Sequence, residues 1–155
     1  MAEFNSRQIT SLASSPKVKA APYDHGKVSV LVGTTPATAA WAQNDTFLIG
    51  VLPKGSRILR SGKCWHGAFG ASVTLQVGVR AAGGGTVVDA AGILAATSAA
   101  TAGLVKNLDT GNLLNAVNGY VTTQDVDVYA TLAGANPTDD IQAEFEIHYI
   151  APAAS

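Results

Sequence analysis

Charged side chains are scarce in this chain. They make up 14% of the 155 residues, against about 25% in an ordinary soluble domain. The formal net charge of -1 excludes a basic nucleic-acid binder that relies on bulk electrostatic attraction. Hydrophobic residues nevertheless make up 47% of the chain, which excludes a polar disordered chain and leaves enough apolar material for one folded domain. A folded, charge-poor domain favours close contact with other protein.

Cysteine pairs and long apolar runs are also missing. The single Cys64 cannot close an intramolecular disulfide, so no disulfide framework is expected. The first residues have no apolar segment of the kind found in secretory signals. The longest low-charge stretch, residues 81–105, has too little Leu and Ile for a membrane span, which needs about 20 mostly apolar residues. We therefore expect synthesis in a reducing cytoplasm and no membrane partner.

Residues 1–26 have the composition of an extended arm. Two prolines push the residues before them toward extended geometry. The apolar residues Ile9 and Leu12 are too sparse to bury a helix on their own. We expect an arm over 1–26 that binds either a neighbouring subunit or its own core, followed by a single domain over 27–155.

A hydrophobic period of two begins at residue 27 and predicts β-strands. The strand segments are 27–32, 46–52, 56–60, 73–79, 121–132 and 141–149, separated by turns rich in Gly and Pro. The Ala-rich segment 91–102 predicts one short helix or helical loop. The fold class is therefore all-β, an antiparallel β-sandwich or jelly roll with at most one short helix.

Charge is distributed unevenly along the chain. Residues 1–80 carry nine Lys or Arg against three Asp or Glu, whereas residues 107–155 carry seven acidic residues and no basic ones. Strands from the two halves could pair, which would place opposite charges across the sheet. Alternatively, a surface with two signs could orient copies or partners on binding. The sequence leaves both interpretations open.

The Cys64-Trp65-His66 segment is the first candidate for chemistry. On a strand, Cys64 and His66 would share a face, as a nucleophile pair or half of a metal site would require. His25 and His148 are the only other histidines, and there is no second cysteine to complete a zinc site. We expect a structural cysteine.

Carboxylates and glycines give no stronger motif. The pairs Asp125/Asp127 and Glu144/Glu146 are each two residues apart, so each could share a strand face for acid–base work or calcium. Because they alternate with apolar residues, we expect these carboxylates, and Tyr129 with them, to face solvent. The glycines at 83–85 lack the spacing of a dinucleotide motif and predict a flexible loop. No enzyme activity, cofactor or metal is expected.

Six segments resemble the small structural proteins of tailed bacteriophages and prophages that accompany the major capsid protein. They are NSRQITSL at 5–12, LPKGSRIL at 52–59, GASVTLQVG at 70–78, GYVTT at 119–123, VYATLAGANPT at 128–138 and IHYI at 147–150. The order and spacing of these segments cover most of the chain. The resemblance implies a jelly-roll head decoration, or cement, protein that binds the capsid exterior as an oligomer.

The resemblance also implies the partners and the location of the protein. The partners would be the major capsid protein and further copies of this chain, as a dimer or trimer, on the surface of a virion assembled in a bacterial host. No catalytic residues are carried over. The residues expected at capsid or subunit contacts are Ile9, Leu12, Val18, Tyr23, Trp41, Lys54, Arg57 and Arg60.

Three other function classes come into consideration, one of them a hydrolase on a jelly-roll scaffold that would depend on Asp125, Asp127 or His66 and for which nothing suggests a substrate. Jelly rolls also serve lectins, so a carbohydrate- or receptor-binding module of the virion is the alternative, with Trp41 or Trp65 as its aromatic platform. The cluster of Lys54, Arg57, Arg60 and Lys63 near Trp65 could suit single-stranded nucleic acid. Aromatic residues are only 6% of the chain and the net charge is acidic, so no nucleic-acid partner is expected.

Overall fold

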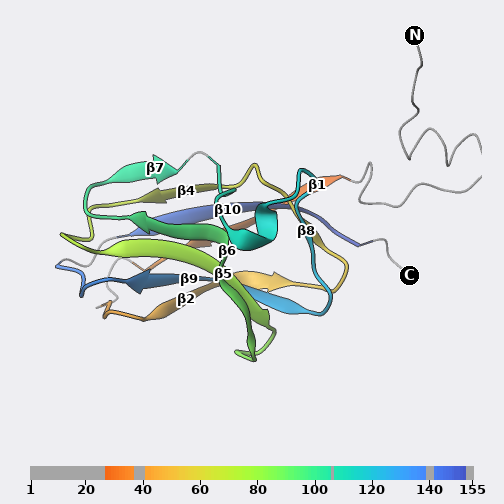
Figure 1. The fold of residues 1–155 in the computed structure, drawn as a ribbon, viewed down its shortest axis with the longest axis horizontal. Helices are drawn as coiled ribbons and strands as arrows, with labels where there is room; N and C mark the ends of the chain where they lie inside the picture. The colour runs from red at the N-terminus through yellow and green to blue at the C-terminus, as the bar shows by residue number, and fades with distance from the viewer. Residues whose placement is uncertain (1–26, 37–40, 106, 139–141, 153–155) are drawn as a thin grey trace, which may run out of the picture.

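The computed structural model of the chain describes residues 27–36, 41–105, 107–138 and 142–152. These residues form two antiparallel β-sheets that stack as a sandwich (Figure 1). Sheet A contains β1 (Val28–Thr34), β3 (Arg57–Ile58), β4 (Lys63–His66), β7 (Gly103–Val105), β8 (Tyr120–Val121) and β10 (Ala143–Ile150). Sheet B contains β2 (Thr46–Leu52), β5 (Thr74–Ala81), β6 (Val87–Ser98) and β9 (Val126–Ala133). The prediction of an all-β antiparallel sandwich is confirmed.

Strand β10 is the centre of sheet A. It pairs with β1 along one edge and with β4 and then β3 along the other. Strand β7 extends the sheet beyond β4, and β8 extends it beyond β3. In sheet B the order is β2-β9-β5-β6. Strands β1 and β2 therefore lie at the edges of their sheets within the described residues.

Strands from the two halves of the sequence pair with one another. β1 and β4 pair with β10, while β2 and β5 pair with β9. Opposite charges consequently meet across the sheets: Lys63 lies opposite Glu146, and Arg80 lies opposite Asp127. The uneven charge along the sequence thus becomes cross-strand pairing in the fold, as the first of the two interpretations predicted.

Alternating side chains fill the space between the sheets. Phe145 and Ile147 of β10 are buried against residues of sheet B such as Val77, Val128 and Leu132. A row of buried Val and Leu on β5 and β9 is what the period-two pattern predicted. Burial of such side chains contributes roughly 1.5–3 kcal/mol each.

The helix predicted over residues 91–102 is wrong. Most of this segment belongs to the twelve-residue strand β6 (Val87–Ser98), which pairs with β5. The register shifts between Leu75/Val77, Val77/Val79 and Val79/Arg80, so β6 is a bulged edge strand. Pairing with β5 overrides the helix propensity of the alanines. The described residues contain one short 3₁₀ helix, η1 (Asn112–Leu114), elsewhere in the chain.

Candidate interaction surface

The outer face of sheet A carries exposed apolar side chains. On β1, Leu31 packs against the core, while Val28, Val30 and Val32 point outward and are 50%, 50% and 63% exposed. Trp65 on β4 is 40% exposed and Leu104 on β7 is 53% exposed. We call these five residues the sheet A patch. Exposed apolar side chains gathered on one face are typical of a protein-binding surface.

The strand register arranges this face in rows. Thr34 lies opposite Glu144, which lies opposite Trp65, which lies opposite Leu104. The next row runs from Val32 through Glu146 to Lys63. Each row therefore has a carboxylate on β10, Glu144 between Thr34 and Trp65 in the first and Glu146 between Val32 and Lys63 in the second.

A shallow groove of about 160 Å³ follows these two rows. Its lining residues are Val32, Thr34, Lys63, Trp65, Leu104, Glu144, Phe145 and Glu146. Small-molecule pockets are usually about 300–1,000 Å³, so this groove is small for an organic cofactor. An extended segment of protein, with its side chains spaced as in a strand, fits it better.

Sequence analysis identified only part of this groove. Glu144 and Glu146 were predicted to face solvent, and this is confirmed. Trp65 was named as a possible aromatic platform, and it is exposed. Val32 and Leu104 were missed, since pairing between strands far apart in the sequence brings them to the groove. The only local signal was that the valines of β1 alternate with Leu31.

A serine, a histidine and a glutamate also meet on this face. Ser61 Oγ is 2.8 Å from His148 Nδ1, and His148 Nε2 is 3.9 Å from Glu146 Oε2. A general base in a nucleophilic relay needs hydrogen-bond distances of about 2.6–3.2 Å on both sides. The distance from His148 to Glu146 lies outside that range in this structure.

Four of the predicted interface residues, Ile9, Leu12, Val18 and Tyr23, lie outside the described residues. Lys54 is exposed. Arg57 is buried, and its Nε donates a hydrogen bond to the carbonyl of Asn118.

Arg60, the next of these residues, forms an ion pair of 3.4 Å with Asp109. The expected basic cluster is therefore not one open basic surface, because Arg57 is buried and Arg60 is paired. A role for these side chains in an interface stays a prediction.

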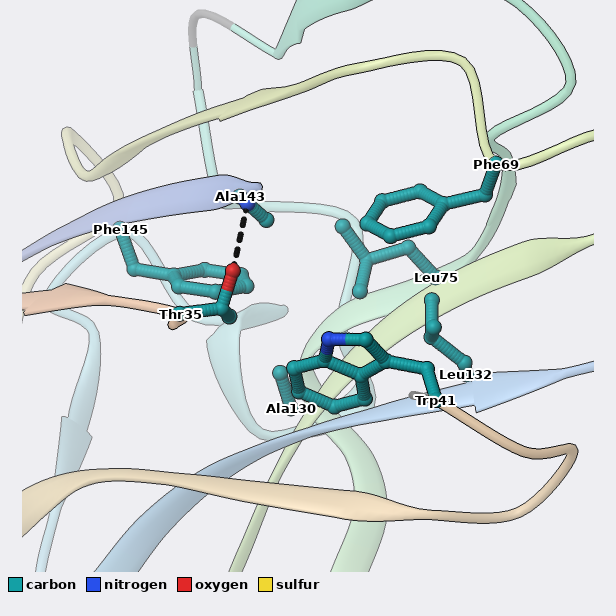
Figure 2. Close-up of a pocket in the computed structure, with 8 residues that line it drawn as sticks. All are labelled: Thr35, Trp41, Phe69, Leu75, Ala130, Leu132, Ala143 and Phe145. Atoms are coloured by element: carbon teal, nitrogen blue, oxygen red, sulfur yellow. Dashed lines mark hydrogen bonds between the residues drawn. The ribbon is translucent and has the colours of Figure 1, made fainter. Parts of the chain in front are cut away.

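Trp41, the last of the predicted interface residues, packs at the edge of the core (Figure 2). Its ring centroid lies 6.1 Å from that of Phe47. Trp41 lines a cavity of about 10 Å³, and Figure 2 shows the side chains around it. The cavity is lined by Thr35, Trp41, Phe69, Leu75, Ala130, Leu132, Ala143 and Phe145. One wall is fixed by Ala143, whose N–H donates to Thr35 Oγ1 at 2.8 Å.

A water needs a cavity of at least about 10–15 Å³, so this space holds no ligand. The Trp41 indole Nε1 is buried and has no hydrogen-bond partner among the described residues. Trp41 is thus a packing residue and not an open aromatic platform.

Cys64 and His66 share the inner face of β4, as their spacing predicted, and both are buried. Burial raises the pKa of the Cys64 thiol to about 12, which leaves it protonated and unreactive near neutral pH. His66 Nδ1 lies 3.0 Å from the carbonyl oxygen of Gly67, and its ring stacks on Phe69. The pair is structural. Within the described ranges, no three potential metal ligands lie together.

Asp127 and Tyr129 do not face solvent, contrary to the prediction. Asp127 is 2% exposed and Tyr129 is 4% exposed. Asp127 accepts hydrogen bonds from Arg80 Nε at 3.1 Å and from the backbone N–H groups of Gly83 and Gly84 at 3.2 and 2.9 Å. The Arg80 guanidinium also lies over the Tyr129 ring, 4.8 Å from its centroid. The β5–β6 turn closes over both side chains.

The same contacts set the ionisation of Asp127. Burial alone would raise its pKa, but the hydrogen bonds from Gly84, Arg80 and Gly83, with the positive charge of Arg80, lower it below the ordinary value. Gly83 and Gly84 both have positive φ, 78° and 75°, which favours glycine and aims their N–H groups at the carboxylate. The predicted flexible loop is therefore a turn anchored on Asp127.

Asp125 is separate from this cluster. It is exposed, as predicted, and its Oδ1 accepts a hydrogen bond of 2.8 Å from the backbone N–H of Lys54. Asp125 and Asp127 consequently do not form a carboxylate pair for catalysis.

No helix in the described part of the chain is long and apolar enough to cross a membrane.

No protein-family model matches the sequence, and no curated protein matches it either. Two solved structures share the fold. A chain of the cyanophage Pam1 capsid asymmetric unit is 21% identical with a TM-score of 0.60, and the match covers 98% of this chain and 100% of that chain. A chain of the capsid of Ralstonia phage GP4 is 18% identical with a TM-score of 0.62, covering 83% of this chain and 87% of that one. These likenesses show a shared sandwich fold.

Proposed function

We propose that this protein is a bacteriophage structural protein that decorates the capsid exterior and stabilises it by bridging major capsid subunits. The observation that carries the proposal is the match to a chain of the cyanophage capsid asymmetric unit over nearly the full length of both chains. The match to a chain of the Ralstonia phage capsid, at a similar TM-score, supports the same structural role.

Chain length supports decoration of a shell. The cyanophage chain is matched over its whole length by almost all of this chain, so the two have similar lengths. This agrees with the resemblance to the small proteins that accompany a major capsid protein. A compact sandwich of this size adds to the surface of a shell, and copies at the joints between capsomers would resist internal pressure.

The surface of the protein suits protein contacts. The sheet A patch offers apolar area around a groove, and strand β1 beside it has hydrogen-bond partners on one side only within the described residues. Such an edge can accept an extended strand from another protein. The arm over residues 1–26 provides a second contact that could lie across a neighbouring capsid subunit.

Co-sedimentation with capsids tests the proposal. Heads of the encoding phage, prepared without this protein, are mixed with the purified full chain and pelleted through a sucrose cushion. We expect the full chain to pellet with the heads, and a chain lacking residues 1–26 to keep its folded circular dichroism spectrum but bind at least about tenfold more weakly. A full chain that stays in the supernatant would overturn the proposal.

A matched pair of substitutions locates the contact. Val32 on sheet A and Val51 on sheet B are both exposed valines on edge strands, 63% and 53% exposed. We expect Val32→Ser to weaken sedimentation with capsids and Val51→Ser to leave it unchanged. Equal effects of the two would show that sheet A is not the capsid-facing side.

A carbohydrate-binding module of the virion is the second candidate. Trp65 is exposed on the wall of the groove, with Glu144 beside it as a hydrogen-bond acceptor for hydroxyl groups. An indole face next to a carboxylate suits a sugar ring. Binding on a glycan array that is lost in Trp65→Ala and kept in Trp41→Phe would favour this function over capsid decoration.

A further inference from the structure

The groove on sheet A lies close to the point where the arm joins the domain. The arm predicted from the sequence ends at residue 26, and β1 begins at Val28 on the edge of sheet A. Val32 of β1 and Trp65 of β4 line the groove and are exposed. A segment of 26 residues that begins beside an uncovered apolar groove has the length to fill it.

The groove also has a charge pattern. Glu144 and Glu146 are both exposed on the outer face of β10, about 6.6–6.8 Å apart along the strand. Glu146 lies opposite Lys63, whereas Glu144 lies between Thr34 and Trp65. Within the described ranges, Glu144 forms no ion pair. The groove therefore has more negative than positive charge, at a spacing set by the strand.

One segment of the chain matches this pattern. Lys17-Val18-Lys19 is the only place in the sequence where two basic residues stand two apart. On an extended segment their side chains share a face, about 6.6–6.8 Å apart. The residues around them were predicted to be extended because prolines follow at positions 16 and 22.

We propose that residues 15–21 of the arm bind in the sheet A groove of their own subunit, with Lys17 at Glu144 and Lys19 at Glu146. The aliphatic parts of the two lysines lie between Val32 on one wall and Trp65 on the other, while their ammonium groups reach the carboxylates. The indole face of Trp65 adds a cation–π contact.

The number of residues between the arm and β1 fits this arrangement. If Lys19 lies at Glu146 and the arm runs in the direction of β10, then Tyr23 reaches the level of Ile150, which is paired with Val28. Residues 24–27 remain to reverse the chain into β1. They include Asp24 and Gly26, and both residue types favour turns.

The tether favours the subunit's own groove over that of a second copy. Eight residues lie between Lys19 and Val28, and these nine steps of the chain span up to about 30 Å when extended, whereas Val28 and Val32 are about 13 Å apart along β1. A short flexible tether gives an effective concentration of about millimolar. A second copy at micromolar concentration cannot compete with that. This inference concerns the free subunit and does not rest on the proposed function.

Zero-length cross-linking of the free full chain tests the contact. A carbodiimide joins a lysine amine to a glutamate only where the two touch, and tryptic peptides then identify the joined residues by mass. We expect links from Lys17 to Glu144 and from Lys19 to Glu146. Links at other lysines of the chain show that the reaction has worked. If these form and neither arm link does, the proposal is wrong.

Isotope mixing tests whether the groove belongs to the same subunit. Equal amounts of ¹⁵N-labelled and unlabelled full chain are mixed, unfolded, refolded together and cross-linked. Linked peptides that are entirely light or entirely heavy support binding within one subunit. Peptides that join a light segment to a heavy one at a statistical frequency would mean that the arm binds a second copy, and would overturn the proposal.

Charge variants give the matched control. We expect Lys17→Gln with Lys19→Gln to expose Trp65, so that acrylamide quenches its fluorescence at least about twofold more strongly than in the parent chain. Lys54→Gln removes an exposed lysine outside the arm and should leave the quenching unchanged. In 1 M salt the Debye length is about 3 Å, so acrylamide quenching of the parent chain should rise toward that of the double variant. Equal quenching in the parent chain, in the double variant and in the parent chain at 1 M salt would contradict the proposed contact.

Discussion

Arg80 and Asp127 face each other across β5 and β9, with Arg80 Nε 3.1 Å from Asp127 Oδ2. The carboxylate is almost completely buried and also accepts the N–H groups of Gly83 and Gly84. One acidic side chain thus fixes both an ion pair between strands and the turn that follows β5. Removing it leaves an arginine and two amides without their acceptor.

Asp127→Ala should therefore destabilise the fold. Removal of one partner of a buried pair typically costs about 3–5 kcal/mol, and the partial exposure of Arg80 points to the lower end, about 3 kcal/mol. Urea unfolding followed by circular dichroism measures the loss. Asp125→Ala is the matched control, because Asp125 is exposed, and it should cost less than about 1 kcal/mol. Equal costs would contradict the anchoring role of Asp127.

The contribution of Asp127 to the free energy of unfolding should also depend on pH. Its folded pKa is lower than its unfolded value, so the stabilisation is fully present above about pH 3.9, the ordinary pKa of Asp. It is lost as the pH falls through the folded pKa. The stability difference between the parent chain and Asp127→Asn should be constant from pH 6 to 5 and shrink below about pH 4. A difference that grows on acidification would contradict this sign.

Cys64 should resist thiol reagents in the folded protein. Its side chain is buried and its pKa is raised to about 12, so almost no thiolate forms at pH 8. A colorimetric disulfide reagent should give no signal within minutes for the native chain and one thiol per chain in guanidinium chloride. Rapid reaction of the native protein would place the thiol at the surface.

The two tryptophans should differ in their effect on stability. Trp41 packs against Phe47 and the core, whereas Trp65 is exposed beside the groove. We expect Trp41→Ala to cost about 2–3 kcal/mol, somewhat less than a fully buried aromatic. Trp65→Ala should cost less than about 1 kcal/mol. Denaturation midpoints of the two variants, compared with the parent chain, test the assignment.

The mass of the free protein in solution tests the predicted self-association. We expect light scattering after size exclusion to show a dimer or trimer that persists on dilution, because a charge-poor surface favours contact with further copies outside the groove that the arm is proposed to fill. A clean monomer at all concentrations would contradict an obligate interface between copies. Under the proposed function, copies would then associate only when they bind the capsid.

Local alternation made the strands predictable, and long-range pairing explains what was missed. The segment 73–79 and the part of 141–149 that the structure describes as β10 were assigned correctly because each strand has one buried face. Residues 91–102 were misassigned because alanine favours helix when no partner is considered, and β6 exists through its pairing with β5. Charge alternation wrongly placed Asp127 in solvent, since nothing local shows that the turn at Gly83 and Gly84 folds over it.

The groove was beyond the reach of sequence patterns for the same reason. Trp65 and Glu144 become neighbours only through the pairing of β4 with β10, and Val32 reaches them through β1. A single-residue slip in either register would turn these side chains to the other face of the sheet. The alternation within each strand predicts which residues are outward, but not which outward residues meet.

The pairing of early strands with late ones has a consequence for biosynthesis. Within the described residues, β1 pairs with β10 alone and β2 pairs with β9 alone, and both partners lie near the end of the chain. As the chain emerges from the ribosome, β5 can pair with β6, but β1 and β2 have no partner strand until β9 and β10 are released. Folding is therefore expected to be post-translational and slow, since non-local contacts dominate. Where many copies are synthesised at once, the nascent chains would expose unpaired strands to one another and depend on chaperones until β9 and β10 are released.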